Sequence, residues 1–195
     1  MNRYRVVFLG DSSSGKTQLY KQILTGKDVD AFDENSLTVI PECGVKALDP
    51  ENFISLLDLS GAENYANFFA DFEFKNTHVG LFCVDLTKQP DEEYIKRKIK
   101  LFQSILPRTA IILVGTKADH PQANRNLLKT LASEGLYATL ITSAKTGEGI
   151  DELSGCLSSF CGERQKSALA THGVFNRPKE VDFIYQVGAG INASL

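Results

Sequence analysis

A glycine-rich octet, GDSSSGKT at residues 10–17, constrains the fold of this chain more than any other feature. It matches the phosphate-binding pattern G-x-x-x-x-G-K-[ST] at all four defined positions. The apolar run at residues 4–9 is typical of a buried strand, and residues 17–24 carry apolar side chains at helical spacing. The sequence therefore predicts a strand, a glycine loop and a helix in direct succession. The alternative is a glycine turn beside a surface lysine.

A loop of this kind is suited to binding phosphate. Its backbone N–H groups turn inward toward phosphate oxygens, and the helix N-terminus adds a partial positive charge. We expect Lys16 to reach the β- and γ-phosphates and the Thr17 hydroxyl to ligate Mg²⁺, which prefers hard oxygen donors. The other loop residues expected to contact a nucleotide are Ser12, Ser13, Ser14, Gly15 and Gln18.

The composition indicates one globular domain of ordinary content, with 43% apolar and 23% charged residues among 195. A net charge of −3 provides no basic excess to neutralise nucleic-acid phosphates, so nucleic acid is not an expected partner. No apolar run is long enough to predict a signal peptide or a transmembrane segment. The four cysteines lack the spacing of a zinc site or a disulfide framework, which favours the reducing cytoplasm.

Apolar runs recur along the chain at intervals typical of alternating strands and helices. The expected strands are residues 4–9, 43–48, 53–57, 79–84, 110–114 and 136–142, and the expected helices are residues 17–24, 91–106, 123–133 and 149–160. The turn sequence at residues 49–52 predicts a hairpin. These elements predict an α/β fold over residues 1–162: a mostly parallel six-stranded sheet with one antiparallel edge strand and helices on both faces. Residues 163–195 are expected to form a C-terminal tail.

Further motifs follow the predicted strands, at the sheet edge where such folds bind ligands. In DLSG, at residues 58–61, the Asp58 carboxylate can hold Mg²⁺ through water, and Gly61 permits close approach of a γ-phosphate. In GTKAD, at residues 115–119, Asp119 can accept two N–H bonds from guanine, a pair that adenine does not offer. A solvated loop aspartate is the alternative.

The last motif is TSAK, at residues 142–145, which can present a backbone N–H to the guanine carbonyl. GDSSSGKT, DLSG, TKAD and TSAK, in this order, resemble the motifs of the Ras superfamily of small GTPases over about residues 4–162. GDSSSGKT is most similar to the Rab branch. The resemblance implies a Ras-like P-loop G domain that binds Mg²⁺ with GTP or GDP and switches when hydrolysis releases two ordered loops. The guanine-binding residues that it implies are Thr116, Lys117, Asp119, Ser143, Ala144 and Lys145.

Three positions qualify this resemblance. Thr116 stands where Ras and Rab members usually have Asn and Rho members have Thr. Thr38 is the best candidate for the first-switch threonine, which ligates Mg²⁺ and meets the γ-phosphate, although a loop threonine without this role is the alternative. Ala62 stands where the family normally has the Gln that orients the attacking water. Lys16, Gly61 and this departure at Ala62 are the expected catalytic positions, and slow hydrolysis is expected.

The resemblance also implies effectors, exchange factors and activating proteins that bind through residues 27–42 and 60–75. The four phenylalanines between residues 68 and 74 either pack under the sheet or form a partner surface. No prenylation cysteine is present at the C-terminus, so peripheral membrane attachment would require the tail or a partner. The expected function is a Rab-like switch in trafficking or signalling. The alternatives are a GTP-binding scaffold with negligible hydrolysis and, disfavoured by TKAD and TSAK, an ATP-dependent kinase.

Overall fold

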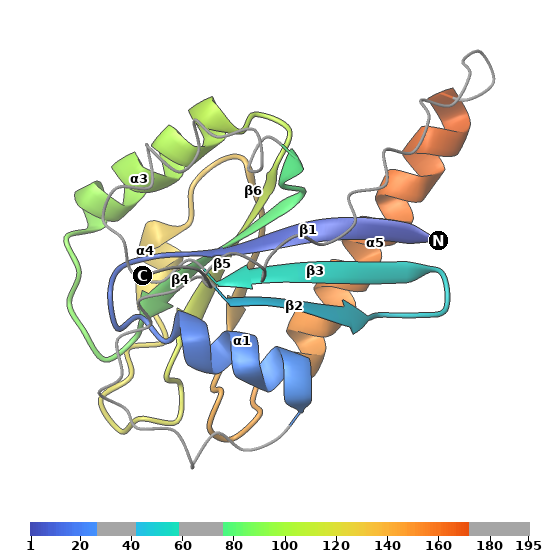
Figure 1. Cartoon of the computed structure of the whole chain (residues 1–195). Helices are drawn as coiled ribbons and strands as arrows, with labels where there is room; N and C mark the ends of the chain where they lie inside the picture. Colours follow the sequence, from blue (N-terminus) through green and yellow to red (C-terminus); the bar gives the residue numbers. More distant parts are fainter. Residues whose placement is uncertain (27–41, 59–75, 172–195) are drawn as a thin grey trace, which may run out of the picture.

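The computed structural model describes residues 1–26, 42–58 and 76–171, which form one six-stranded sheet with helices on both faces (Figure 1). The elements, in chain order, are β1 (Asn2–Leu9), α1 (Lys16–Thr25), β2 (Glu42–Ala47), β3 (Asn52–Asp58), β4 (Val79–Asp85), α3 (Glu92–Ile105), β5 (Ala110–Thr116), α4 (Leu127–Leu131), β6 (Leu136–Ile141) and α5 (Ile150–Thr171). The alternation predicted from the apolar runs is confirmed. Within the described ranges, no helix has the length and apolar character needed to cross a membrane.

The strand order in the sheet is β2-β3-β1-β4-β5-β6. All neighbouring strands are parallel except β2 and β3, which form an antiparallel hairpin at the edge, as predicted. The turn of this hairpin is held by Asp49, whose carboxylate accepts the backbone N–H groups of Glu51 and Asn52, each at 2.9 Å. A side chain that accepts backbone donors two and three residues ahead stabilises a tight turn. The turn sequence thus fixes where the hairpin reverses.

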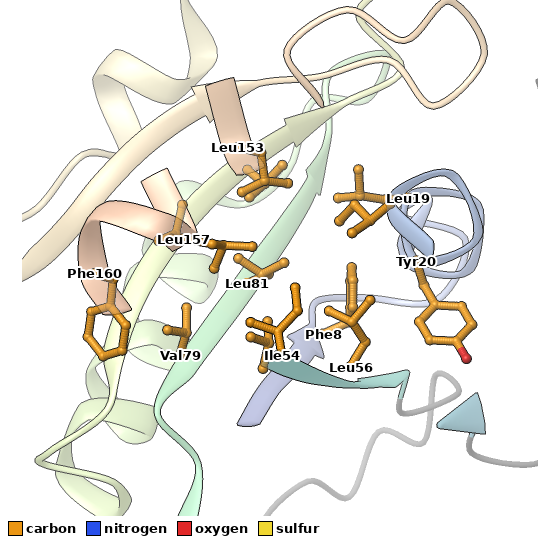
Figure 2. Close-up of a cluster of buried hydrophobic side chains, with 14 of the residues drawn as sticks. Phe8, Leu19, Tyr20, Ile54, Leu56, Val79, Leu81, Leu153, Leu157 and Phe160 are labelled. Carbon is orange, nitrogen blue, oxygen red and sulfur yellow. The ribbon is translucent and has the colours of Figure 1, made fainter. Parts of the chain in front are cut away.

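Helices cover both faces of the central strands, and successive strand residues point to opposite sides, so alternate residues enter two different cores. In β1, Val6 and Phe8 pack under α1 and α5, whereas Val7 and Leu9 pack under α3 and α4. Figure 2 shows the first of these cores, in which Phe8 from β1 faces Leu19 and Tyr20 of α1. The near-continuous apolar runs of β4 and β5 follow from this arrangement, since every position of a doubly covered strand is buried.

Two helix predictions need correction. The helix predicted over residues 123–133 is reduced to α4, Leu127–Leu131. The Asn124 backbone N–H donates to the Leu86 carbonyl oxygen at 2.8 Å, and the Asn124 side chain accepts the N–H of Asn126 at 3.1 Å. These bonds attach the chain to the end of β4, so the three-leucine helix starts only after them.

The helix predicted over residues 149–160 instead continues to Thr171 as α5. Contacts with the sheet extend beyond residue 160: the Tyr4 hydroxyl donates to the Cys161 carbonyl at 3.2 Å, and Gln165 Nε2 donates to Asn52 Oδ1 at 2.7 Å. The division expected at residue 162 therefore falls inside a continuous helix. Residues 172–195 of the expected C-terminal tail lie outside the described residues, and the tail over residues 163–195 stays a prediction.

Candidate nucleotide-binding site

The octet at residues 10–17 forms a tight loop between β1 and α1, as its pattern predicts. Gly10 has φ = 130°, and a Cβ there would overlap the carbonyl oxygen of Cys83 in β4. Gly15, with φ = 82°, immediately precedes α1. Both conformations are left-handed and favour glycine, because other residues adopt them at a cost. The two glycines thus bring the loop backbone close to the sheet and place the loop N–H groups at the start of α1.

Lys16 lies buried at the centre of this loop. Its Nζ donates to the carbonyl oxygens of Gly10 at 3.0 Å and Asp11 at 2.6 Å, and it lies 3.5 Å from Ser14 Oγ. Burial lowers the pKa of Lys16, although neighbouring acidic groups oppose the shift. These acceptors are uncharged oxygens, so an anion entering the loop would give the ammonium stronger, charge-assisted hydrogen bonds.

Thr17 and Asp58 meet where the start of α1 approaches the end of β3. The Thr17 hydroxyl donates to Asp58 Oδ2 at 2.6 Å, and Asp58 is fully buried. A hydroxyl and a carboxylate are hard oxygen donors, which is the donor type that Mg²⁺ prefers. These two of the three predicted metal ligands therefore lie together in an arrangement that fits this cation. The third, Thr38, lies outside the described residues.

The two loops predicted to recognise guanine contact one another directly. The Ser143 hydroxyl donates to Asp119 Oδ1 at 2.6 Å, and the Ala118 backbone N–H donates to the Thr142 carbonyl oxygen at 3.1 Å. Ser143 Oγ also accepts the N–H of Thr146 at 3.1 Å, which fixes the hydroxyl within its own loop. The Asp119 carboxylate is thus oriented by the loop that follows β6.

Thr116 connects these loops to the phosphate loop. Its buried hydroxyl lies 2.7 Å from the Ser14 carbonyl oxygen and 3.2 Å from that of Val84. A Cβ at Gly15 would lie 3.3 Å from the Thr116 side chain, so the two segments are in close packing contact. A hydroxyl therefore makes the link at the position where Ras and Rab members usually have Asn.

Asp85 is the main site residue that sequence reasoning missed. It ends β4, is buried, and accepts a salt bridge from Lys117 Nζ at 2.8 Å. Burial alone would raise the pKa of Asp85, but hydrogen bonds from Lys117 and Thr87 outweigh it and lower the pKa. Lys117 has φ = 59°, a strained conformation that this ion pair helps to hold. An aspartate at the end of an otherwise apolar strand is the signal that could have identified it.

A second missed contact lies at the surface. Arg125 makes a two-pronged salt bridge with Glu148, with N–O distances of 2.6 and 2.9 Å, and also donates to the Ala118 carbonyl oxygen at 3.3 Å. Arg125 and Glu148 are about half exposed, so this pair contributes little to stability. Its geometry nevertheless links the segment after β5 to the segment after β6.

The structure therefore places the predicted residues in two connected groups. The residues predicted to bind phosphate and metal lie together around the loop before α1: Ser12, Ser13, Ser14, Gly15, Lys16, Thr17, Gln18 and Asp58. The residues predicted to bind the base lie in the loops after β5 and β6: Thr116, Lys117, Asp119, Ser143, Ala144 and Lys145. Thr38, Gly61 and Ala62 lie outside the described residues, as do residues 60–75 and, within the predicted partner-binding range 27–42, residues 27–41.

This fold and these loops define a P-loop nucleotide-binding protein. The family model described as Ras family matches residues 5–157, and the chain belongs to this family. It is similar to the Ras-related protein RabL of Dictyostelium discoideum, at 25% identity over 76% of this chain and 78% of that protein. It is also similar to the Ras-related protein Rab-33A of Mus musculus, at 24% identity over 85% of this chain and 73% of that protein. The chain is thus a Rab-like small GTPase of the GTP-binding switch type.

Proposed function

We propose that this protein binds Mg²⁺ with GTP or GDP and acts as a Rab-like switch in membrane trafficking or signalling. The observation that most supports this proposal is the hydrogen bond from the Thr116 hydroxyl to the Ser14 carbonyl oxygen. This bond joins the loops predicted to bind guanine to the phosphate-binding loop. A site joined in this way can hold the phosphates and the base of one nucleotide at the same time. Guanine is the proposed base because Asp119 is held at the site by Ser143.

The roles that we propose follow from the chemistry of each group. Lys16 and the loop N–H groups stabilise negative charge on the phosphates. Thr17 and Thr38 ligate the metal, and Asp58 holds it through water. The metal, when bound, neutralises charge on the β- and γ-oxygens. Asp119 accepts guanine N–H groups and Lys117, held by Asp85, packs beside the base.

The base preference is tested by competition between GTP and ATP for the purified protein. We expect GTP to displace a bound fluorescent GDP analogue at concentrations at least about a hundred times lower than ATP, because adenine lacks the pair of N–H donors that the Asp119 carboxylate can accept. Mass spectrometry of the nucleotide that co-purifies provides an independent measurement, and GDP or GTP is expected. Equal displacement by ATP and GTP would contradict the proposal.

We further propose slow intrinsic hydrolysis, because Ala62 has no polar group to orient the attacking water. In Ras, which has a Gln for this role, intrinsic turnover is already only about 10⁻⁴ s⁻¹. Single-turnover measurements on this protein should therefore give a rate at or below that scale. Ala62→Gln should raise the rate while GTP affinity stays within about twofold, because the amide acts on water rather than on the nucleotide. No gain from Ala62→Gln would favour a GTP-binding scaffold.

We also propose that effectors, exchange factors and activating proteins bind through residues 27–42 and 60–75, and that the protein is cytoplasmic with peripheral membrane attachment through residues 163–195 or a partner. The support is family membership and the similarity to two Rab-related proteins. Binding of a candidate effector to the GTP form but not to the GDP form is the expected result. Equal binding to both forms would contradict a switch.

A further inference from the structure

A carboxylate stands inside the predicted phosphate loop. Asp11 is the second residue of the octet, and its main-chain carbonyl oxygen accepts a hydrogen bond from Lys16 at 2.6 Å. Burial lowers the pKa of Lys16 and the charge of the Asp11 carboxylate opposes this shift, so the carboxylate also acts on Lys16. A negative charge this close to Lys16 opposes the binding of an anion, because like charges repel at short range when water does not fully screen them. The phosphate loop therefore contains a group that works against its proposed ligand unless another residue cancels the charge.

Lys98 of α3 is placed to cancel it. Its Nζ lies 2.7 Å from Asp11 Oδ1, although the two residues are far apart in sequence. The Lys98 side chain is only 17% exposed, against 50% for Asp11, so the ammonium is the more buried partner. It also lies 4.3 Å from the centre of the Tyr94 ring, one turn earlier on α3, within the range of a cation–π contact. Lys98 is thus held over the loop by two independent contacts.

The charge state of Lys98 is suited to this role. Burial alone would lower the pKa of Lys98, but hydrogen bonds to Asp11 and Tyr94 outweigh it and raise the pKa. The ammonium therefore stays protonated throughout the physiological pH range. Removing it would leave the Asp11 carboxylate uncompensated beside the loop.

We infer that Lys98 is a positioning residue of the phosphate site, which slows nucleotide release by cancelling the charge of Asp11. The inference rests on the proposed function, since it requires a bound guanine nucleotide. It assigns to α3, which carries none of the predicted nucleotide contacts, an effect on nucleotide release that acts through Asp11. It also explains how a loop with an acidic side chain can hold a polyphosphate.

The test compares Lys98→Met with Lys100→Met, which removes the same charge from an exposed position on the same helix. The measured quantity is the release rate of a fluorescent GDP analogue from the full chain with Mg²⁺ present. We expect Lys98→Met to release it about fivefold faster at about 50 mM salt and less than twofold faster at about 500 mM salt, where the charges are screened. Lys100→Met should stay within about twofold of wild type at both concentrations.

Removal of the carboxylate separates charge cancellation from a general structural effect. The double variant Asp11→Asn with Lys98→Met should return to within about twofold of the wild-type rate. Asp11→Asn alone should release the analogue no faster than wild type, and this result does not depend on whether Lys98→Met folds. Thermal unfolding of the nucleotide-free variants shows whether each is folded.

Equal release rates for Lys98→Met and Lys100→Met would overturn the inference, as would a double variant that releases as fast as Lys98→Met. Asp11→Asn alone releasing faster than wild type would overturn it too, because the carboxylate would then be favourable. A wild-type protein that binds the GDP analogue no more tightly than an ADP analogue would instead refute the proposed guanine-nucleotide function.

Discussion

The salt bridge between Asp85 and Lys117 should stabilise both the fold and the base loop, and Asp85→Asn tests it at nearly constant volume. Asp85 is buried at the end of β4 and accepts three hydrogen bonds: from Lys117 Nζ at 2.8 Å, from the Thr87 N–H at 2.9 Å and from the Thr87 hydroxyl at 2.7 Å. An amide can still accept from the Thr87 backbone. It cannot compensate the Lys117 ammonium.

The stability that Asp85→Asn loses depends on how exposed Asp85 and Lys117 are. Breaking a fully buried ion pair costs about 3–5 kcal/mol, because the remaining charge is left without compensation. The Lys117 side chain is 41% exposed, so water solvates its ammonium once the carboxylate is gone. The loss is then closer to that of one hydrogen bond to a charged group, about 1.5–3 kcal/mol. We expect Asp85→Asn to lower the free energy of unfolding by about 2 kcal/mol at pH 7.

Urea unfolding of the nucleotide-free protein measures this difference, with Glu134→Gln as an exposed control expected within about 0.5 kcal/mol of wild type. The folded-state pKa of Asp85 is lowered from 3.8, so its contribution is fully present above that pH. It is lost as the pH falls through the lower folded-state value. The difference between wild type and Asp85→Asn should therefore shrink below pH 3.8. A loss under about 0.5 kcal/mol at pH 7, or one that persists in acid, would refute this reasoning.

The site makes further predictions. Asp119→Asn should shift preference from guanine toward xanthine nucleotides, because the amide offers a donor where guanine also presents donors; unchanged GTP preference in a competition assay would contradict this. Lys16→Ala should weaken GTP binding at least about tenfold in titration calorimetry, because a charge-assisted hydrogen bond is lost. If this variant bound GTP as tightly as wild type, the octet would be a glycine turn with no role in phosphate binding. Thr116→Val should cost about 1 kcal/mol in urea unfolding, because the Ser14 and Val84 carbonyl oxygens lose their hydroxyl donor; equal stability would mean that the link is unimportant.

Most of the fold could be predicted because a strand that is buried on both faces has apolar residues at nearly every position. The runs at residues 79–84 and 110–114 are apolar at nearly every position, which is expected only when helices cover both sides of a strand. The hairpin was equally accessible, because the turn is stabilised by the side chain of Asp49, a local contact. Local causes of this kind can be recognised in a single sequence.

Helix ends were harder to predict, because tertiary contacts decide them. The pattern around residues 123–133 is helical, but the bond from Asn124 to Leu86 holds the chain in another path. The opposite occurs in α5, where packing against Tyr4 and Asn52 accompanies a helix that runs past its predicted end. Neither partner is close in sequence, and the apolar periodicity that marks a helix carries no information about them.

Tertiary contacts also explain why the sequence predicted the motif residues but not Asp85 and the contacts that hold the loops together. The motifs mark the loops, but the contacts that join those loops pass through the ends of β4 and β5, where Val84 pairs with Gly115 and Asp85 with Thr116. This register places Asp85 beside Lys117 and the Thr116 hydroxyl beside Ser14. A shift of one residue would turn each of these side chains to the opposite face of the sheet. The site therefore depends on the alignment of two buried strands as much as on its loop motifs, and that alignment is set by the packing of both cores.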